Sequence, residues 1–312
     1  MRVCLLTDEK IEDYDPAAYF KIYDWDYVTV TAPVAEFIAK LARSRHYDVY
    51  LNIYEGIDDD ENSGLRFVQA LEQLNLPFTG ADSRFYSATR ERMQSVAQAH
   101  GLVFARGFHA VSDHDLARAN DLTYPLIVKH PNSFASLGLT KDSRVMNSDE
   151  LRCQLERISA AYGSARIEEF IDGREMSCLV VENADDPSAP FVYQAVEVQF
   201  PENETFLHED AKWYSWEIFV IPVKETDLAA RIQDIARKYF IAIEGNGYAR
   251  IDFRVRPNGE VVILEINPNC GILYYGPDDR SPSDLPIQWD AGGHDLFLER
   301  IFQAAIKRKN AK

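Results

Sequence analysis

Two carboxylates, Asp252 and Glu265, lie on opposite arms of a predicted β-hairpin within GYARIDFRVRPNGEVVILEINPNCG, residues 247–271. The dipeptide Asn258-Gly259 predicts a two-residue type I′ turn, because both residues tolerate positive φ. That turn makes Asp252 face Glu265, with Cβ atoms about 4.5–5.5 Å apart. Opposed carboxylates repel each other unless a cation lies between them, so the pattern predicts a metal site. A solvated sheet face with balancing arginines is the alternative that the hairpin alone leaves open.

The other residue pairs of this hairpin separate an apolar face from a polar one. The apolar face comprises the pairs Val255 and Val262, Phe253 and Leu264, and Ile251 and Ile266. On the polar face Arg250 meets Asn267, and Arg254 meets Ile263. Alternation with a period of two is typical of a strand pair with one buried side, so we expect the apolar face to pack on a core.

Composition excludes several classes of function. The chain has 312 residues, of which 46% are hydrophobic and 12% aromatic, as expected for a folded protein of two or three domains. Lys and Arg total 33 against 50 Asp and Glu, giving a net charge of −17. Such a surface repels nucleic acid and anionic lipid, so neither is an expected partner. An anionic ligand would need a local basic pocket.

Localisation and redox state follow from simple patterns. The N-terminal apolar run is too short for a signal peptide, and no run of about 18 apolar residues occurs. The cysteines Cys4, Cys153, Cys178 and Cys270 show no metal-finger or redox spacing, which indicates that most of them are core thiols in a reducing compartment. We therefore expect a cytoplasmic protein.

The predicted elements fall into three segments. Residues 1–83 alternate strands (2–6 and 48–54) with helices and predict a doubly wound α/β domain. Residues 84–185 predict a small α+β domain, with a helix from Thr89, a strand at 123–131, a helix from Ser148 and two strands around Asp172-Gly173. Residues 186–312 predict a second α+β domain, with a strand at 191–200, a helix at 227–243, the hairpin and a terminal helix.

This order, together with YARIDF followed by ILEINPN, resembles the ATP-grasp ligases and, within them, the D-alanine–D-alanine ligase group. The resemblance covers nearly the whole chain. It implies an ATP-grasp fold in which the central and C-terminal domains clasp ATP. It also implies that Asp252, Glu265 and Asn267 hold two Mg²⁺ ions, with Mn²⁺ as an alternative, and hard oxygen ligands suit these ions.

The same resemblance assigns contacts to ATP. Lys129 would reach the phosphates, and Arg90 stands where the family has a lysine, which keeps the charge but not the shape. Within EEFIDGRE, Glu168, Glu169 and Ile171 would lie along adenine, and Glu175 would accept hydrogen bonds from the ribose hydroxyls. Lys212 matches a lysine on the family's closing loop, and it is assigned both nucleotide binding and catalysis.

Three further residues are implied in catalysis. Ser136 begins a Ser-Leu-Gly stretch that aligns with the family's mobile loop, although Phe134 and Ala135 replace that loop's first Gly and Ser. Arg250 and the backbone N–H of Gly271 would face a tetrahedral oxyanion, where each donor is worth about 3 kcal/mol.

Both substrate pockets depart from the family. The N-terminal LLTDEKIEDYDP lacks the glycine-rich turn and the glutamate that binds the first amino group, and no motif chooses among Asp8, Glu9 and Asp13. The serine for the second carboxylate falls at Gly276. A larger or more apolar acceptor would explain the nearby aromatic residues, which could instead anchor loops: Trp213 (a tyrosine in the family), Trp216, Tyr274 and Tyr275.

We therefore predict an ATP-dependent carboxylate–amine ligase that forms an amide or peptide bond through an acyl phosphate. Its substrates would be amino acids or amino-acid-like acids rather than two D-alanines, and a homodimer is a family expectation. A kinase-type ATP-grasp phosphotransferase and a non-catalytic nucleotide-binding regulator remain open. Free phosphate released along with ADP distinguishes the ligase from the kinase.

Overall fold

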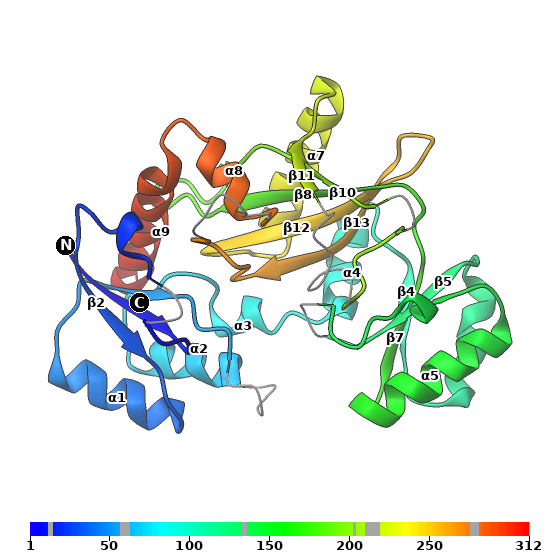
Figure 1. The fold of residues 1–312 in the computed structure, drawn as a ribbon, viewed down its shortest axis with the longest axis horizontal. Coiled ribbons are helices and arrows are strands. Elements are labelled where there is room, and N and C mark those ends of the chain that lie inside the picture. Colours follow the sequence, from blue (N-terminus) through cyan, green and yellow to red (C-terminus); the bar gives the residue numbers. More distant parts are fainter. Residues whose placement is uncertain are drawn as a thin grey trace.

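The structure is a computed structural model that describes residues 1–11, 15–56, 63–132, 136–201, 204–209, 219–274 and 281–311. In this part of the chain the strands form three sheets, and helices pack on each of them (Figure 1). The shorter helical segments are η1 (Ala17–Tyr19), α3 (Ser83–Tyr86), η2 (Asp113–Asp121), η3 (Lys141–Ser143) and α8 (Asp284–Trp289).

The first sheet is parallel, in the order β2-β1-β3, with β1 at Arg2–Thr7, β2 at Asp24–Thr29 and β3 at Val49–Asn52. Successive side chains point to opposite faces. Cys4 and Leu6 pack with α1 (Val34–Ser44) and α2 (Ser63–Gln73). Val3 and Leu5 pack with α9 (Gly293–Asn310), the last helix of the chain (Figure 1). The predicted parallel α/β layer is confirmed, and one of its covering helices comes from the far end of the sequence.

The second sheet is antiparallel, in the order β4-β7-β5-β6. Its core side is covered by α5 (Ser148–Tyr162), which buries Leu151, Leu155 and Ile158. The side chain of Asn147 caps this helix by accepting from the backbone N–H of Glu150 at 3.0 Å. The strands are β4 (Gly107–Ala110), β5 (Leu126–Lys129), β6 (Arg144–Val145) and β7 (Ala165–Glu169).

The third and largest sheet has the order β11-β10-β8-β12-β13, and β9 also pairs with β8. Two helices, α4 (Arg90–Ala99) and α7 (Thr226–Ala242), bury one face of it. The strands are β8 (Arg174–Val181), β9 (Phe191–Val192), β10 (Val196–Gln199), β11 (Phe219–Pro222), β12 (Tyr248–Val255) and β13 (Val261–Pro268).

The predicted turn between β12 and β13 is wrong in type. The N–H of Gly259 donates to Arg256 O at 2.8 Å, and the N–H of Arg256 donates to Glu260 O at 2.9 Å. The loop thus has three residues, and only Gly259, at φ +86°, adopts the left-handed region within it. Pro257 explains the difference, because its fixed φ suits the first central position of a type I turn. Near the turn the pairing is therefore one residue out of the predicted register.

A β-bulge restores the predicted pairing farther along the hairpin. The register shifts between Asp252 and Phe253, so that Phe253 pairs with Ile263 while Asp252 pairs with Glu265. Leu264 is the extra residue. Ile263 donates its N–H to Val103 O and accepts from the Ala105 N–H, both at 2.9 Å, so the segment before β4 holds β13 at the bulge.

Other expectations differ from the structure in sheet membership. The two strands around Asp172-Gly173, β7 and β8, belong to different sheets, and β8 pairs with β12. The predicted boundary at residue 185 assigns β8 to the central domain, whereas β8 pairs with β12, which follows that boundary. The division of the chain into three domains therefore stays a prediction. The single strand expected at 191–200 is interrupted and forms β9 and β10. The sequence analysis missed β2, β4, β6 and β11.

No helix among the described residues has the length and apolar composition needed to span a membrane.

Candidate active site

A row of polar side chains lies on the face of the largest sheet opposite α4 and α7. Alternation along β12 places Arg250, Asp252 and Arg254 on this face, while Ile251 and Phe253 enter the core. Across the strands Asp252 lies between Ser177 of β8 and Glu265 of β13, so the opposed carboxylates of the prediction are confirmed as neighbours. The row continues with Glu175 beside Arg254 and Asn267 beside Arg250.

Asp252 accepts a dense set of hydrogen bonds. Arg250 donates Nε to Oδ1 at 2.7 Å and Nη2 to Oδ2 at 2.8 Å, forming a bidentate pair. Ser177 Oγ donates to Oδ1 at 2.6 Å, and Asn267 Nδ2 donates to Oδ2 at 2.7 Å. Asn267 Nδ2 also lies 3.3 Å from Glu265 Oε1, so its Oδ1 is the atom suited to a cation.

Glu265 is paired with a residue from another element. Arg90, at the start of α4, donates Nη1 to Glu265 Oε2. Burial alone would raise the pKa of the Glu265 carboxyl, but Arg90 foremost and then Lys129 hold that pKa well below its usual range. Glu265 is therefore ionised at neutral pH.

The ligand set fits a magnesium ion that arrives with further oxygen ligands. Two carboxylates and one amide oxygen cannot fill an octahedral shell, and the described residues contain no cluster of three or more His, Cys, Asp or Glu side chains. Mg²⁺ commonly takes one or two carboxylates and completes its shell with substrate phosphates and water. Asp252, Glu265 and Asn267 match that pattern and not that of a protein-only metal site.

Lys129 and Glu168 form a buried pair beside this row. Lys129 Nζ lies 2.5 Å from Glu168 Oε2, and Arg166 Nε lies 2.9 Å from Glu168 Oε1. Burial and the neighbouring Arg90 lower the pKa of Lys129. Burial would raise the pKa of Glu168, but Lys129 and Arg166 hold it below its usual value. Positive side chains thus gather here in a chain that is strongly acidic overall.

Arg166→Met should lower the free energy of unfolding by about 3 kcal/mol, because the change breaks a buried ion pair. Arg166 is 1% exposed and also lies 2.9 Å from Glu91, besides its bond to Glu168. Urea unfolding followed by circular dichroism measures the change. The control is Arg152→Met, which removes a half-exposed pair with Asp113 and should cost less than about 1 kcal/mol. Equal losses in both variants would contradict a special role for the buried pair.

The predicted nucleotide residues are only partly brought together. Glu175 Oε2 accepts from Arg254 Nη2 at 2.6 Å and Nε at 3.2 Å, and burial raises the pKa of Glu175 although Arg254 opposes this. Ile171 is buried, and its carbonyl accepts from Arg254 Nη1 at 3.4 Å. Glu169 points away from Glu168 and instead pairs with Arg106 at 2.5 Å.

Two further predicted catalytic residues, Ser136 and Gly271, lie apart from the row or beyond its end. Ser136 donates to Leu207 O at 2.9 Å, so its hydroxyl binds another loop. Gly271 follows β13, and a Cβ added to it would lie 2.1 Å from the Tyr274 hydroxyl. Several residues singled out in the sequence fall outside the described part of the chain: Asp13, Phe134, Ala135, Lys212, Trp213, Trp216, Tyr275 and Gly276.

One N-terminal candidate is already engaged. The Asp8 carboxylate accepts from the backbone N–H of Gly56 at 2.9 Å and from that of Glu55 at 3.3 Å. Asp8 thus anchors the chain after β3, which argues against Asp8 as the ligand of an amino group.

The sequence analysis missed several partners of the site residues. They are Ser177, which binds Asp252, Arg166, which binds Glu168, and Ser283, whose Oγ lies 3.4 Å from Arg250 Nη1. Arg254, which binds Glu175, was not assigned a role in the site. Ser283 lies at the start of α8, next to the fully buried Asp284. Period-two alternation on β8 could have indicated Ser177, but no local signal connects Ser283 to Arg250, which is 33 residues away.

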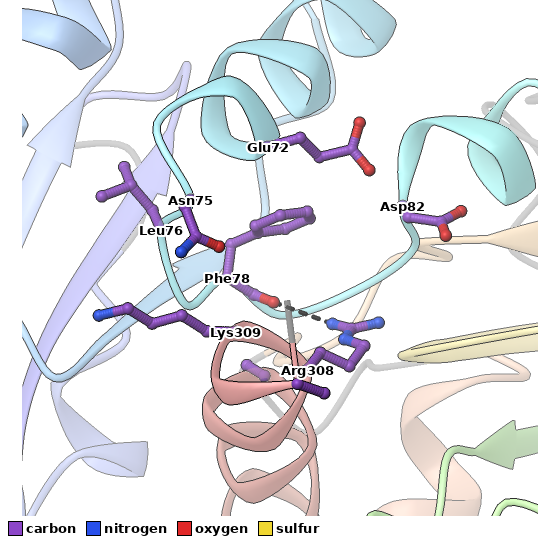
Figure 2. A pocket seen from close by; sticks show the side chains of 9 residues that line it. Glu72, Asn75, Leu76, Phe78, Asp82, Arg308 and Lys309 are labelled. Carbon is purple, nitrogen blue, oxygen red and sulfur yellow. Dashed lines mark hydrogen bonds between the residues drawn. The ribbon is translucent and has the colours of Figure 1, made fainter.

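Two cavities lie outside this site. One, of about 230 Å³, is lined by α2, the segment after it and α9, where Arg308 donates to Phe78 O at 2.9 Å (Figure 2). The other, of about 320 Å³, lies at the hairpin turn beside Gly173 and Arg256. Among the residues that the structure describes, no predicted site residue lines either cavity.

Comparisons with known proteins identify the family of the chain. The family model described as the D-ala D-ala ligase C-terminus matches residues 96–278, more than half of the chain. The D-alanine–D-alanine ligase of Bifidobacterium longum subsp. infantis is 28% identical over 305 residues, covering 89% of this chain and 73% of that protein. The vancomycin B-type resistance protein VanB of Enterococcus faecalis is 26% identical, covering 85% of this chain and 75% of its own.

Solved structures match over the full length. The D-alanine–D-alanine ligase of Bacillus anthracis complexed with ATP has a TM-score of 0.74 at 16% identity and covers 100% of this chain and 99% of its own. The VanG D-Ala:D-Ser ligase of Enterococcus faecalis has a TM-score of 0.71 at 16% identity, covering 97% and 99%. These likenesses establish the ATP-grasp fold. The chain belongs to the D-alanine–D-alanine ligase family and is an ATP-dependent carbon–nitrogen ligase.

Proposed function

We propose that this ligase uses ATP and Mg²⁺ to join an amino acid or amino-acid-like carboxylate to an amine, and that its substrate pair is not two D-alanines. One observation carries the proposal: Asp252, Glu265 and Asn267 share one sheet face with Arg250, while Arg90 and Lys129 reach the same place from other elements. Carboxylates for a cation and cations for phosphate thus occur together.

The reaction has two steps. A carboxylate oxygen of the first substrate attacks the γ-phosphorus of ATP, and ADP leaves. The amine then attacks the acyl carbon, a C–N bond forms, inorganic phosphate leaves and the amine nitrogen loses a proton. Bound Mg²⁺ would supply charge neutralisation at the transferring phosphoryl group.

The chain's own residues have distinct roles in these steps. Lys129 and Arg90 would bind phosphate oxygens, and Glu175 would accept from ribose hydroxyls. Asp252 holds the Arg250 guanidinium by two bonds, which presents the arginine in a fixed orientation for the oxyanion of the tetrahedral intermediate. Glu265 and Asn267 would complete the protein ligands of the ion.

The segment beyond β13 supports a substrate pair other than two D-alanines. The Tyr274 hydroxyl packs directly over Gly271, next to the proposed oxyanion site. Two hydrogen bonds hold the backbone of this segment: Tyr19 Oη donates to Tyr274 O at 2.6 Å, and the Leu273 N–H donates to Asp284 Oδ1 at 2.7 Å. Leu273 has φ +63°, a conformation that residues other than glycine adopt only when their surroundings hold them there. A tyrosine would thus shape the pocket where the amine attacks.

We expect a condensed product when the protein is incubated with ATP, MgCl₂ and pooled carboxylates and amines. Mass spectrometry identifies the product, and ADP and free phosphate should form in equal amounts. D-alanine alone serves as a separate arm. D-alanyl-D-alanine as the best product would refute the substrate part of the proposal. ADP without free phosphate would indicate a kinase, and nucleotide binding without turnover across the pools would indicate a regulator. A cytoplasmic location and a homodimer stay predictions.

A further inference from the structure

Both carboxylates of the proposed metal site already have cationic partners in the protein. Asp252 is bound by the Arg250 fork, and Glu265 is bound by Arg90 Nη1. The arginines differ in origin. Arg250 lies two residues from its partner on the same strand, whereas Arg90 comes from α4 and packs against the sheet from a different element. Arg90 is 7% exposed, so it belongs to the buried cluster of charged side chains at this site.

Each carboxylate of this buried cluster has at least one cationic partner in the protein. Asp252 has Arg250, Glu265 has Arg90, and Glu168 has Lys129 together with Arg166. Counted over these residues, three carboxylates face four cations, so the cluster carries no net negative charge. A free divalent cation would therefore gain little on entering and would meet Arg90 and Lys129 at close range, where like charges repel.

An anionic ligand reverses this balance. Arg90 and Lys129 lie close enough that Arg90 lowers the pKa of Lys129, so the two cations repel each other. Phosphate oxygens would give both of them new partners. Once Arg90 turns to a phosphate, Glu265 loses its counter-ion and becomes available to a metal ion, and the same phosphates complete the metal's shell.

We propose that Arg90 is an internal counter-ion that keeps the metal site closed to divalent cations until a nucleotide binds. Metal and nucleotide then bind in a fixed order: the nucleotide enters first or carries its metal with it. The inference rests on the proposed function, because it takes Asp252 and Glu265 as metal ligands. It concerns Arg90 as a positioning residue and requires no knowledge of the acid or amine.

The experiment is a titration of metal-stripped protein with MnCl₂, in which electron paramagnetic resonance measures free Mn²⁺. Without nucleotide we expect no site-specific binding by the unaltered protein, and with the non-hydrolysable analogue AMP-PNP we expect binding of Mn²⁺. Arg90→Met should bind Mn²⁺ without nucleotide at least about tenfold more tightly than the unaltered protein, because Glu265 then lacks its guanidinium. Adding Glu265→Gln to Arg90→Met should remove this gain, which separates the site from the acidic surface.

Two matched variants complete the test. Arg92→Met removes a more exposed arginine of the same helix, which pairs with Glu244, and should behave as the unaltered protein does. Arg90→Gln removes the charge but keeps a polar side chain, and it replaces Arg90→Met in the comparison if the latter does not fold.

Two results would overturn the inference. One is binding of Mn²⁺ by the unaltered protein without nucleotide as tightly as by the neutral Arg90 variants. The other is equally weak binding by those variants when folded. The metal assignment is tested separately: if AMP-PNP induces Mn²⁺ binding that Glu265→Gln abolishes, Glu265 retains its proposed role as a metal ligand whatever the Arg90 variants do.

Discussion

Asp252→Asn and Glu265→Gln, each alone, are expected to lower ADP formation at saturating ATP and MgCl₂ by at least about 100-fold. Even residues that only support a metal ligand typically contribute 10–100-fold, and these two are proposed as ligands themselves. Each variant keeps the shape of the side chain but removes a charge. A coupled assay for ADP measures the rate once an acid and amine pair is known.

Stability has to be followed in the same variants, because Asp252→Asn leaves the buried Arg250 without its anionic partner. The fold should survive, as judged by far-ultraviolet circular dichroism. Glu260→Gln, at the exposed hairpin turn, is the control and should retain the original rate. Near-normal, magnesium-dependent activity in both site variants would show that the opposed carboxylates do not hold the ion.

Arg250→Lys is expected to lower kcat by about 10²–10³-fold while KM for ATP changes by only a few-fold. Removing one preformed donor to an oxyanion has an effect of this size. Lysine keeps the charge, but it cannot bind both Asp252 oxygens and still offer a planar donor to a reacting group. Measuring kcat and KM separately distinguishes this role from nucleotide binding.

The control for this variant is Arg256→Lys. Arg256 directly follows β12, away from the site, and its Nε lies 2.9 Å from Glu260 Oε2. Arg256→Lys should leave both constants unchanged. A rise in KM for ATP with unchanged kcat in Arg250→Lys would instead make Arg250 a phosphate contact.

The hairpin shows how far sequence reasoning reaches. Alternation and the Asn258-Gly259 signal predicted the pairing of Asp252 with Glu265, and that pairing is present. The predicted register fails between the turn and the bulge, because Pro257 favours a three-residue loop and Leu264 then adds one residue on the other strand. A two-residue loop and a three-residue loop with a bulge therefore give the same neighbours at Asp252.

Other features could not be predicted because they depend on contacts between distant segments. Arg166 reads as one charge in a strand, yet it is fully buried by partners on α4 and β7. Strand β2 contains two aspartates in six residues, which argues against a strand until Asp26 is seen to bind Arg2 and Tyr47. The pairing of Arg90 with Glu265 likewise joins residues 175 positions apart.

The position of α9 has a consequence for how the protein reaches its native state. Val3, Leu5 and Leu51 of the first sheet are buried by Phe297, Ile301 and other residues of the last helix. During synthesis, therefore, β1 and β3 emerge with one apolar face that stays uncovered until α9 has also left the ribosome. The N-terminal segment cannot complete its core as an independent early unit, and such exposed surface invites aggregation or chaperone binding. The first sheet can thus complete its core only when α9 docks onto it.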